Sequence, residues 1–225
     1  MKQINKYICG HFENDKFSIL EHFENSNFSI LERLHINKDT GNHHYNYHPK
    51  TKDELKELVY KLVKERGNDA DLNDIDTSEI TDMSYLFYDF KFNVDISNWD
   101  VSKVEDMFSM FKKSKFDGDI SKWNVSNVED MGDMFRHSEF TAKNGDISEW
   151  DVSNVKDMSY MFKNSKFNGD ISKWDVSNVK DMRYMFYDSS FNRDISNWDV
   201  NNVKDINYMF KYTPLEKNPP KWYKN

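Results

Sequence analysis

The stretch DISKWDVSNVKDMRYMF, residues 170–186, recurs with few changes along most of this chain. Its opening tripeptide, Asp-Ile-Ser, occurs five times at steps of 24, 27, 24 and 24 residues, and a tryptophan follows each copy in register. The tripeptides begin at Asp95, Asp119, Asp146, Asp170 and Asp194. The longer step carries Thr141, Ala142 and Lys143 as extra residues at one point of the period. This self-similarity is typical of proteins whose repeats stack, and the insertion predicts a loop at one edge of the stack.

A single repeat contains the signals of a short helix and a short strand. The apolar residues of 104–111 have the spacing of one helical face, and Ser102 with Glu105 matches a capping box. Residues 119–121 have the character of a short strand. We therefore predict a β/α solenoid of six repeats over residues 71–215, in which neighbouring repeats share one continuous apolar core.

The segment before the first repeat has the clearest helical pattern of the chain. Residues 51–66, TKDELKELVYKLVKER, place their leucines and valines on one face. Thr51 and Glu54 match a capping box, and Gly67 stands where a helix commonly ends. We expect residues 49–70 to form an amphipathic helix that caps the open end of the core.

The two ends of the chain depart from the repeat. Within the N-terminal segment, residues 1–48, HFENDKFSILE at 11–21 is followed by HFENSNFSILE at 22–32. The alternation of apolar residues indicates short strands, and a helical tail is the alternative. At the other end we expect residues 216–225 to form a cap, because Pro219 falls where the repeat places isoleucine and has no N–H for a ladder.

Composition narrows the classes of protein to which this chain can belong. Its 225 residues carry a net charge of −8, which disfavours nucleic acid as a partner, and the single cysteine, Cys9, excludes an internal disulfide. Aromatic residues make up 16% of the chain, more than a disordered chain carries. No apolar run is long enough to span a membrane, and the N-terminus lacks the apolar region of a signal peptide. As the chain stands, we expect a cytoplasmic protein that does not insert into membranes.

The repeat resembles that of the BspA-like leucine-rich-repeat surface proteins of bacteria. The similarity is carried by residues 170–186 and their copies over 71–215, and by the lead-in at 48–87. The resemblance implies a leucine-rich-repeat-like β/α solenoid without catalytic activity. It also implies a secreted or cell-surface protein, and some members of the family are adhesins. The duplication at 11–32 has no counterpart in the family pattern.

Three sets of polar residues are candidate metal ligands or acceptors of backbone N–H groups. Besides the Asp-Ile-Ser aspartates, a second column contains Asp106, Asp130, Asp157, Asp181 and Asp205. Carboxylates stacked in this way are potential calcium ligands, but they also accept backbone N–H groups at turns, and we favour this second interpretation. His43, His44 and His48 lie in HHYNYH without a further ligand at metal-binding spacing. We therefore expect no cofactor or metal.

The aromatic residues offer two candidate binding surfaces. The tryptophans are nearly invariant between repeats, which favours packing in the core over stacking on sugars. Positions that vary between repeats are better candidates for contact with a partner, because the core does not constrain them. Our candidate partner-binding residues are Tyr160, Tyr184, Tyr208, Arg183, Tyr187 and Tyr212. The alternative is an ordinary solvated face.

No catalytic motif is present: there is no nucleophile elbow, phosphate loop, zincin motif or Cys–His arrangement. We therefore predict a non-enzymatic interaction protein, adhesin-like if exported, that presents a repeat surface to a protein partner. The alternatives are carbohydrate binding through the aromatic rows, an intracellular decoy or effector scaffold, and a hydrolase within the first 50 residues.

Overall fold

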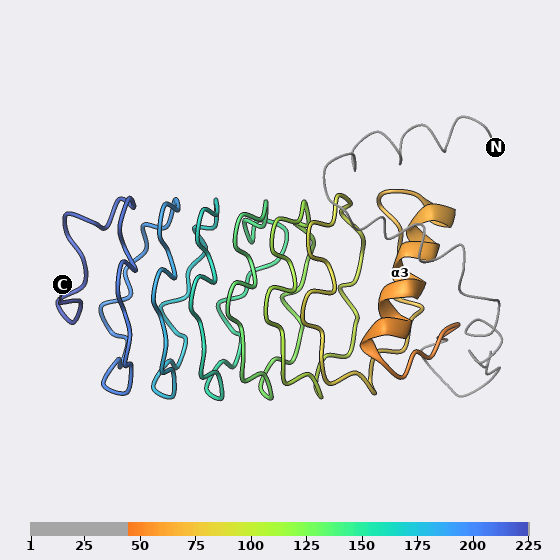
Figure 1. Ribbon diagram of the computed structural model, residues 1–225, viewed down its shortest axis with the longest axis horizontal. Coiled ribbons are helices and arrows are strands. Elements are labelled where there is room, and N and C mark those ends of the chain that lie inside the picture. Colours follow the sequence, from red (N-terminus) through yellow and green to blue (C-terminus); the bar gives the residue numbers. More distant parts are fainter. Residues whose placement is uncertain (1–44, 225) are drawn as a thin grey trace, which may run out of the picture. The chain divides into compact units, whose positions relative to one another are not determined.

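The structure, a computed structural model, describes residues 45–224. One α-helix, α3 (Lys52–Arg66), is followed by repeats that lie side by side in chain order, from the helix to the C-terminal end of this region (Figure 1). Among these residues no strand of several residues forms, and neighbouring repeats are joined instead by single parallel bridges. These bridges link, in order, Asp82, Asp106, Asp130, Asp157, Asp181 and Asp205. The bridges follow the sequence period, including its one longer step.

Helix α3 forms as predicted, with both of its ends capped. The Thr51 side chain accepts a hydrogen bond from the Glu54 N–H (3.2 Å), and the Gly67 N–H donates to the Val63 carbonyl (2.9 Å). The Glu54 carboxylate accepts a hydrogen bond from the Lys50 N–H. In a full capping box it would accept from the N–H of the N-cap residue, Thr51, one position later. Five apolar side chains of the helix are buried: Leu55, Leu58, Val59, Leu62 and Val63.

The buried face of α3 packs on the first repeats. The Tyr60 ring meets Phe90 edge to face, with ring centroids 5.7 Å apart, and Lys52 Nζ donates to Asp82 Oδ2 (2.6 Å). The helix therefore covers the beginning of the apolar core, where no preceding repeat is present to bury it.

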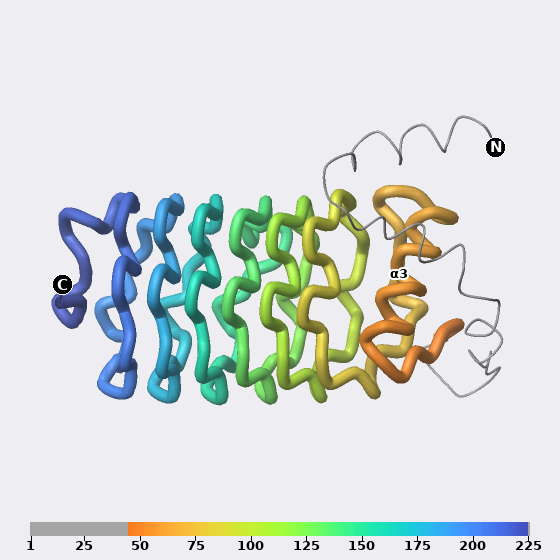
Figure 2. The backbone as a smooth tube through the Cα atoms, viewed as in Figure 1, coloured from red at the N-terminus to blue at the C-terminus, as the bar shows by residue number. Residues whose placement is uncertain are grey.

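A ladder of backbone hydrogen bonds joins each repeat to the next. In the middle of the stack, the N–H groups of Met131, Asp133 and Phe135 donate to carbonyls of the following repeat at 3.0, 2.8 and 2.9 Å. The N–H group of Met134 donates instead within its own repeat, to the Met131 carbonyl (3.2 Å). Hydrogen bonds to the next repeat thus alternate along the chain with hydrogen bonds that close three-residue turns within a repeat. Figure 2 shows the backbone of the successive repeats lying side by side.

The short helix expected in each repeat is absent, and this prediction was wrong. Residues 104–107 are extended around the bridge at Asp106 and residues 108–113 form turns, while the Glu105 N–H donates to the Thr81 carbonyl (2.8 Å) rather than to a Ser102 cap. Apolar residues spaced by three fit a helix and a series of three-residue turns equally well. The strand expected at 119–121 is also a turn, because the Ser121 N–H donates to Asp119 Oδ1 (2.9 Å).

Two columns of residues with left-handed backbone explain why no helix propagates. Twelve such residues, none of them glycine, have φ between 52° and 63°. The first column contains Tyr85, Ser109, Asp133, Tyr160, Tyr184 and Tyr208, and the second contains Asp89, Lys113, His137, Asn164, Asp188 and Tyr212. Wherever a following repeat exists, each of these residues donates its own N–H to it. The strain of the left-handed residues, about 1 kcal/mol each, is thus compensated by the ladder.

Aromatic rings form the centre of the core. Phe111, Phe135 and Phe162 stack nearly parallel from repeat to repeat, with centroids 5.4 and 5.6 Å apart. The tryptophans line the same core and are only 3–4% exposed from Trp99 to Trp198, so the prediction that they pack is confirmed. Each indole N–H donates to a carbonyl of the preceding repeat at 3.0–3.1 Å. The tryptophan column therefore both fills the core and ties the repeats together.

The last residues of the described region close the final repeat. The Trp222 indole continues the tryptophan column and donates to the Ile195 carbonyl (3.1 Å). Glu216 accepts from the Tyr212 N–H (3.0 Å), which has no further repeat to bond, and the Tyr223 ring meets Phe210 edge to face at 5.0 Å. Side chains of residues 216–224 thus occupy positions that another repeat would fill. The duplication at 11–32, His43 and His44 lie outside the described residues.

We expect substitutions in the tryptophan column to separate packing from hydrogen bonding. Trp150→Phe keeps an aromatic ring but removes the bond to the Ile120 carbonyl, so the free energy of unfolding should fall by about 1–2 kcal/mol. Trp150→Ala should cost about 3–5 kcal/mol. Urea denaturation followed by far-ultraviolet circular dichroism measures both. Trp222→Phe, in the half-buried last copy, is the control and should cost less; equal losses would contradict a role in tying the repeats together.

Ser109 and Ser114 provide a matched test of left-handed strain. Both side chains are buried, and neither hydroxyl has a hydrogen-bond partner among the described residues, but only Ser109 has positive φ. Glycine at 109 relieves the strain, so Ser109→Gly should be more stable than Ser114→Gly by about 1–2 kcal/mol. Thermal unfolding of the two variants beside the parent protein measures this difference. The same melting temperature for both would show that position 109 is not strained.

Candidate functional site

Five of the six predicted partner-binding residues form one cluster at the surface. The rings of Tyr160 and Tyr184 are parallel with centroids 5.0 Å apart, and Tyr208 continues the row at 5.0 Å. Tyr187 lies 5.3 Å from Tyr184 and meets Tyr212 edge to face at 5.2 Å. Tyr208 and Tyr212 are 47% and 57% exposed, while the other three are partly exposed. The sequence prediction therefore identified residues that lie together.

Two lysines lie among these tyrosines. Lys163 Nζ lies 5.4, 4.9 and 4.6 Å from the ring centroids of Tyr160, Tyr184 and Tyr187. Lys211 Nζ lies 5.3 Å from the Tyr208 centroid and 5.1 Å from the Tyr212 centroid. These are cation–π distances. We call this cluster the tyrosine–lysine ridge; it consists of Tyr160, Lys163, Tyr184, Tyr187, Tyr208, Lys211 and Tyr212.

Arg183, the sixth predicted residue, borders the ridge but has its own carboxylate partners. Its guanidinium lies 5.9 Å from the Tyr160 centroid, Nε is 3.3 Å from Asp181 Oδ2, and NH1 is 4.0 Å from Asp205 Oδ2. Arg183 is thus ion-paired, whereas Lys163 and Lys211 form no ion pair with any residue of 45–224.

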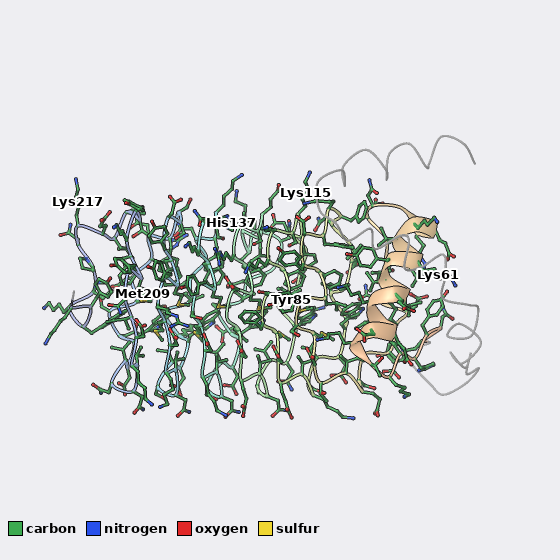
Figure 3. The ribbon with its side chains drawn as sticks, in the orientation of Figure 1. Lys61, Tyr85, Lys115, His137, Met209 and Lys217 are labelled. Carbon is green, nitrogen blue, oxygen red and sulfur yellow. The ribbon has the colours of Figure 1, made fainter. Side chains whose placement is uncertain are left out.

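The same columns carry a second aromatic group near α3. Tyr85 meets Phe108 edge to face at 5.4 Å and lies 5.9 Å from Tyr88, whose ring faces Lys113 at 5.5 Å. Figure 3 labels Tyr85 and His137, one from each left-handed column. Between this group and the ridge, buried Asp133 is bound by Lys112 (2.9 Å) and Arg136 (3.2 Å). An ion-paired centre therefore separates two aromatic surfaces.

Several cations gather beside the ridge, although the chain as a whole is acidic. Partial desolvation lowers the pKa of His137, and four nearby cations lower it further: Arg136, Lys113, Lys163 and Lys112. The pKa of Lys163 is also lowered, first by burial and then by Arg136. Each shift shows that an additional positive charge is disfavoured here.

Our sequence analysis missed the lysines of the ridge, although the repeat register contains a signal for them. The position that holds Lys163 is occupied in every repeat by tyrosine or by a cation: Tyr88, Lys112, Arg136, Lys163, Tyr187 and Lys211. Tyr85 likewise falls in register with Tyr160. Neighbouring repeats place these side chains about 5 Å apart, so the alternation of rings and cations predicts cation–π contacts.

The aspartate columns bind backbone N–H groups, as we favoured from the sequence. In the second column, Asp106, Asp130 and Asp157 each accept from the N–H group two residues later, at 2.7–2.8 Å. The Asp-Ile-Ser aspartates do the same, for example Asp170 with the Ser172 N–H (2.9 Å). Among residues 45–224, no group of three or more His, Cys, Asp or Glu side chains is placed to hold a metal ion.

Burial and the stacking of like charges together raise the pKa of Asp130. Burial raises the pKa of this carboxyl to about 6, and Asp157, Asp106 and Asp133 add to the increase, whereas the bond from the Gly132 N–H opposes it. The charged form of Asp130 is thus disfavoured in the folded protein, where it lies between two other aspartates of its column.

The remaining sequence candidates lie apart from the ridge. His48 Nδ1 is 3.0 Å from Asp76 Oδ2, and its Nε2 is buried without a hydrogen-bond partner in the described region. The tryptophans from Trp99 to Trp198 are buried and present no open ring face, and Trp222 is half-buried. No helix within residues 45–224 has the length and apolar character to cross a membrane.

The repeats match one known family in sequence. The family described as "Mycoplasma protein of unknown function, DUF285" matches residues 54–144 and again residues 137–223. The chain belongs to this family. The comparisons with curated proteins and with solved structures gave no match. The two DUF285 matches span α3, all of the stacked repeats and the ridge, so the ridge is built on the scaffold that defines the family.

In this DUF285 chain, Asp130 makes stability depend on pH. The pKa of Asp130 is higher in the folded than in the unfolded protein, so the contribution of this carboxyl to stability is greatest below about pH 4 and is lost as pH rises from about 4 to about 6. Asp130→Asn keeps an oxygen acceptor and should stabilise the protein at pH 7.5 by about 1 kcal/mol, allowing for solvent screening.

Melting temperatures between pH 4 and 8 test this prediction. The advantage of Asp130→Asn over the parent protein should be largest above pH 6 and should disappear near pH 4. Asp205→Asn, at the end of the same column with one acidic neighbour, is the matched control and should show a smaller effect. A pH-independent difference for Asp130→Asn would contradict the electrostatic explanation.

Proposed function

We propose that this protein is a non-enzymatic interaction module that binds a macromolecular partner, most directly another protein, through the tyrosine–lysine ridge. The main observation is the clustering of five tyrosines, two of them exposed and three partly exposed, around two lysines. Exposed Tyr208 and Tyr212 both have positive φ, at 59° and 63°. Strained residues of this kind cluster at functional sites, and tyrosine is favoured at the energetic centre of interfaces.

The alternation of ladder bonds and turns supports the scaffold part of the proposal. We propose that the repeats form a leucine-rich-repeat-like solenoid, in the sense that each repeat contacts its two neighbours and adds one step to a continuous surface. The stack between α3 and Trp222 is consistent with this. The resemblance to BspA-like proteins extends the proposal to an adhesin-like role at a cell surface, with an intracellular scaffold as the alternative.

Carbohydrate binding is less well supported than protein binding. Sugars stack on the open face of an aromatic ring, whereas the faces of Tyr160 and Tyr184 are turned towards each other and that of Tyr187 towards Lys163. The tryptophan row is buried. The ridge therefore presents mainly ring edges, hydroxyl groups and ammonium groups, which suit the polar and charged groups of a protein surface.

A comparison of two surface variants tests the proposal. The ridge variant Tyr208→Ala/Tyr212→Ala removes its two most exposed rings, and Lys115→Ala/Lys122→Ala, two exposed lysines outside the ridge, is the control. Affinity capture from host and bacterial extracts, with quantitative mass spectrometry, should yield a protein that the parent and control retain. The ridge variant should retain about tenfold less of it. A glycan array with the same three proteins serves as the second arm.

The outcomes distinguish the proposed classes of partner. Specific glycan binding that the ridge variant loses would replace protein binding by carbohydrate binding. Retention of every captured protein by the ridge variant would reject the ridge as the binding surface. Circular dichroism melting of the three proteins first establishes that both variants are folded.

A further inference from the structure

The lysines of the ridge lack carboxylate partners, in contrast to the cations beside it. Lys112, Arg136 and Arg183 all form ion pairs with aspartates. Within residues 45–224, Lys163 and Lys211 form no ion pair, and their ammonium groups lie over tyrosine rings. Asp133 and Asp188 act on Lys163 only from a longer distance. A tyrosine ring stabilises a cation by about 0.5–1 kcal/mol at exposed sites, and the ammonium donors stay available for an anion.

The electrostatic environment makes an anionic ligand favourable at this place. Burial first and Arg136 second lower the pKa of both Lys163 and His137, whereas Asp133 and Asp188 oppose the shift at Lys163. The chain as a whole carries −8, so this local excess of positive charge opposes the overall charge. A negatively charged group beside Lys163 would relieve this repulsion, while the acidic remainder of the surface would repel a long polyanion.

The spacing of the two lysines sets the geometry of the ligand. Lys163 and Lys211 occupy the same register position two repeats apart, with Tyr187 between them. Two repeat steps of about 4.8 Å place them about 10 Å apart, close to the ~9 Å rise of one three-residue turn of a polyproline II helix, in which residues i and i+3 lie on the same side. The row of Tyr160, Tyr184 and Tyr208 runs beside them in steps of 5.0 Å.

We propose that the ridge binds an acidic polypeptide segment in the polyproline II conformation, in which carboxylates three residues apart pair with Lys163 and Lys211 while the segment lies along the tyrosine row. The inference rests on the proposed function and adds the chemistry of the partner to it. Ion pairs at these lysines supply specificity and fast association, and the rings supply contact area.

The test uses a defined peptide with the full-length protein. Fluorescence anisotropy follows a labelled peptide of four Glu-Ser-Ser units, with four Gln-Ser-Ser units as the neutral control, at 20 and 150 mM NaCl. The acidic peptide should bind, the neutral one should not, and salt should weaken binding. Lys163→Gln/Lys211→Gln should bind about tenfold more weakly than the parent protein.

A second pair of lysines provides the matched control. Lys166→Gln/Lys217→Gln removes the same charge from exposed residues outside the ridge and should keep the affinity within about twofold. Equal losses in the two double variants would overturn the inference, because binding would then follow net charge alone. Equal binding of both peptides, or no binding of the acidic peptide, would also overturn it.

Two further results separate this inference from the proposed function. Binding of a heparin dodecasaccharide in place of the peptide would assign the lysines to an anionic glycan and overturn the polypeptide assignment. If Lys163→Gln/Lys211→Gln retains a protein partner that Tyr208→Ala/Tyr212→Ala loses, the acidic-segment inference fails while the ridge stands as the binding surface.

Discussion

The backbone ladder between neighbouring repeats is the interaction on which the rest of this structure depends. Alternate N–H groups, such as those of Met131 and Asp133, leave their own repeat and bond to the next one. This pairing can continue only if the backbone repeatedly takes left-handed turns, which side chains other than glycine adopt at a cost. The stack supplies that cost through hydrogen bonds and through the parallel phenylalanine rings of the core. An isolated repeat has neither source of stability.

The ladder also determines the character of the surface. It places the same sequence position of each repeat in one column, so side chains from distant parts of the chain become neighbours. In the core, this produces rows of identical rings and a column of tryptophans. At the edge of the core, where the residue varies between repeats, one column holds buried Ser109, buried and ion-paired Asp133, and exposed Tyr208. The columns therefore carry a different surface at each end of the stack, and the ridge belongs to the C-terminal part.

Local signals in the sequence were sufficient where local interactions decide the structure. The caps at Thr51 and Gly67 form within a few residues, so the bounds of α3 could be predicted. The role of the repeated aspartates could also be predicted, because each accepts a hydrogen bond from an N–H group only two residues later, as Asp170 does. The helix expected over 104–111 failed because a three-residue apolar spacing does not distinguish an α-helix from turns whose hydrogen-bond partners lie 24 residues away.

By itself the sequence determined the period, the position of the insertion, the capping helix, the membership of the core and the tyrosines that vary between repeats. These follow from apolar pattern and register, which are readable along one chain. Only the tertiary structure decided the left-handed columns, the contacts of Lys163 and Lys211 with the rings, and the raised pKa of Asp130. The physical reason is that these properties depend on side chains in adjacent repeats, whose distance and burial are set by the stack.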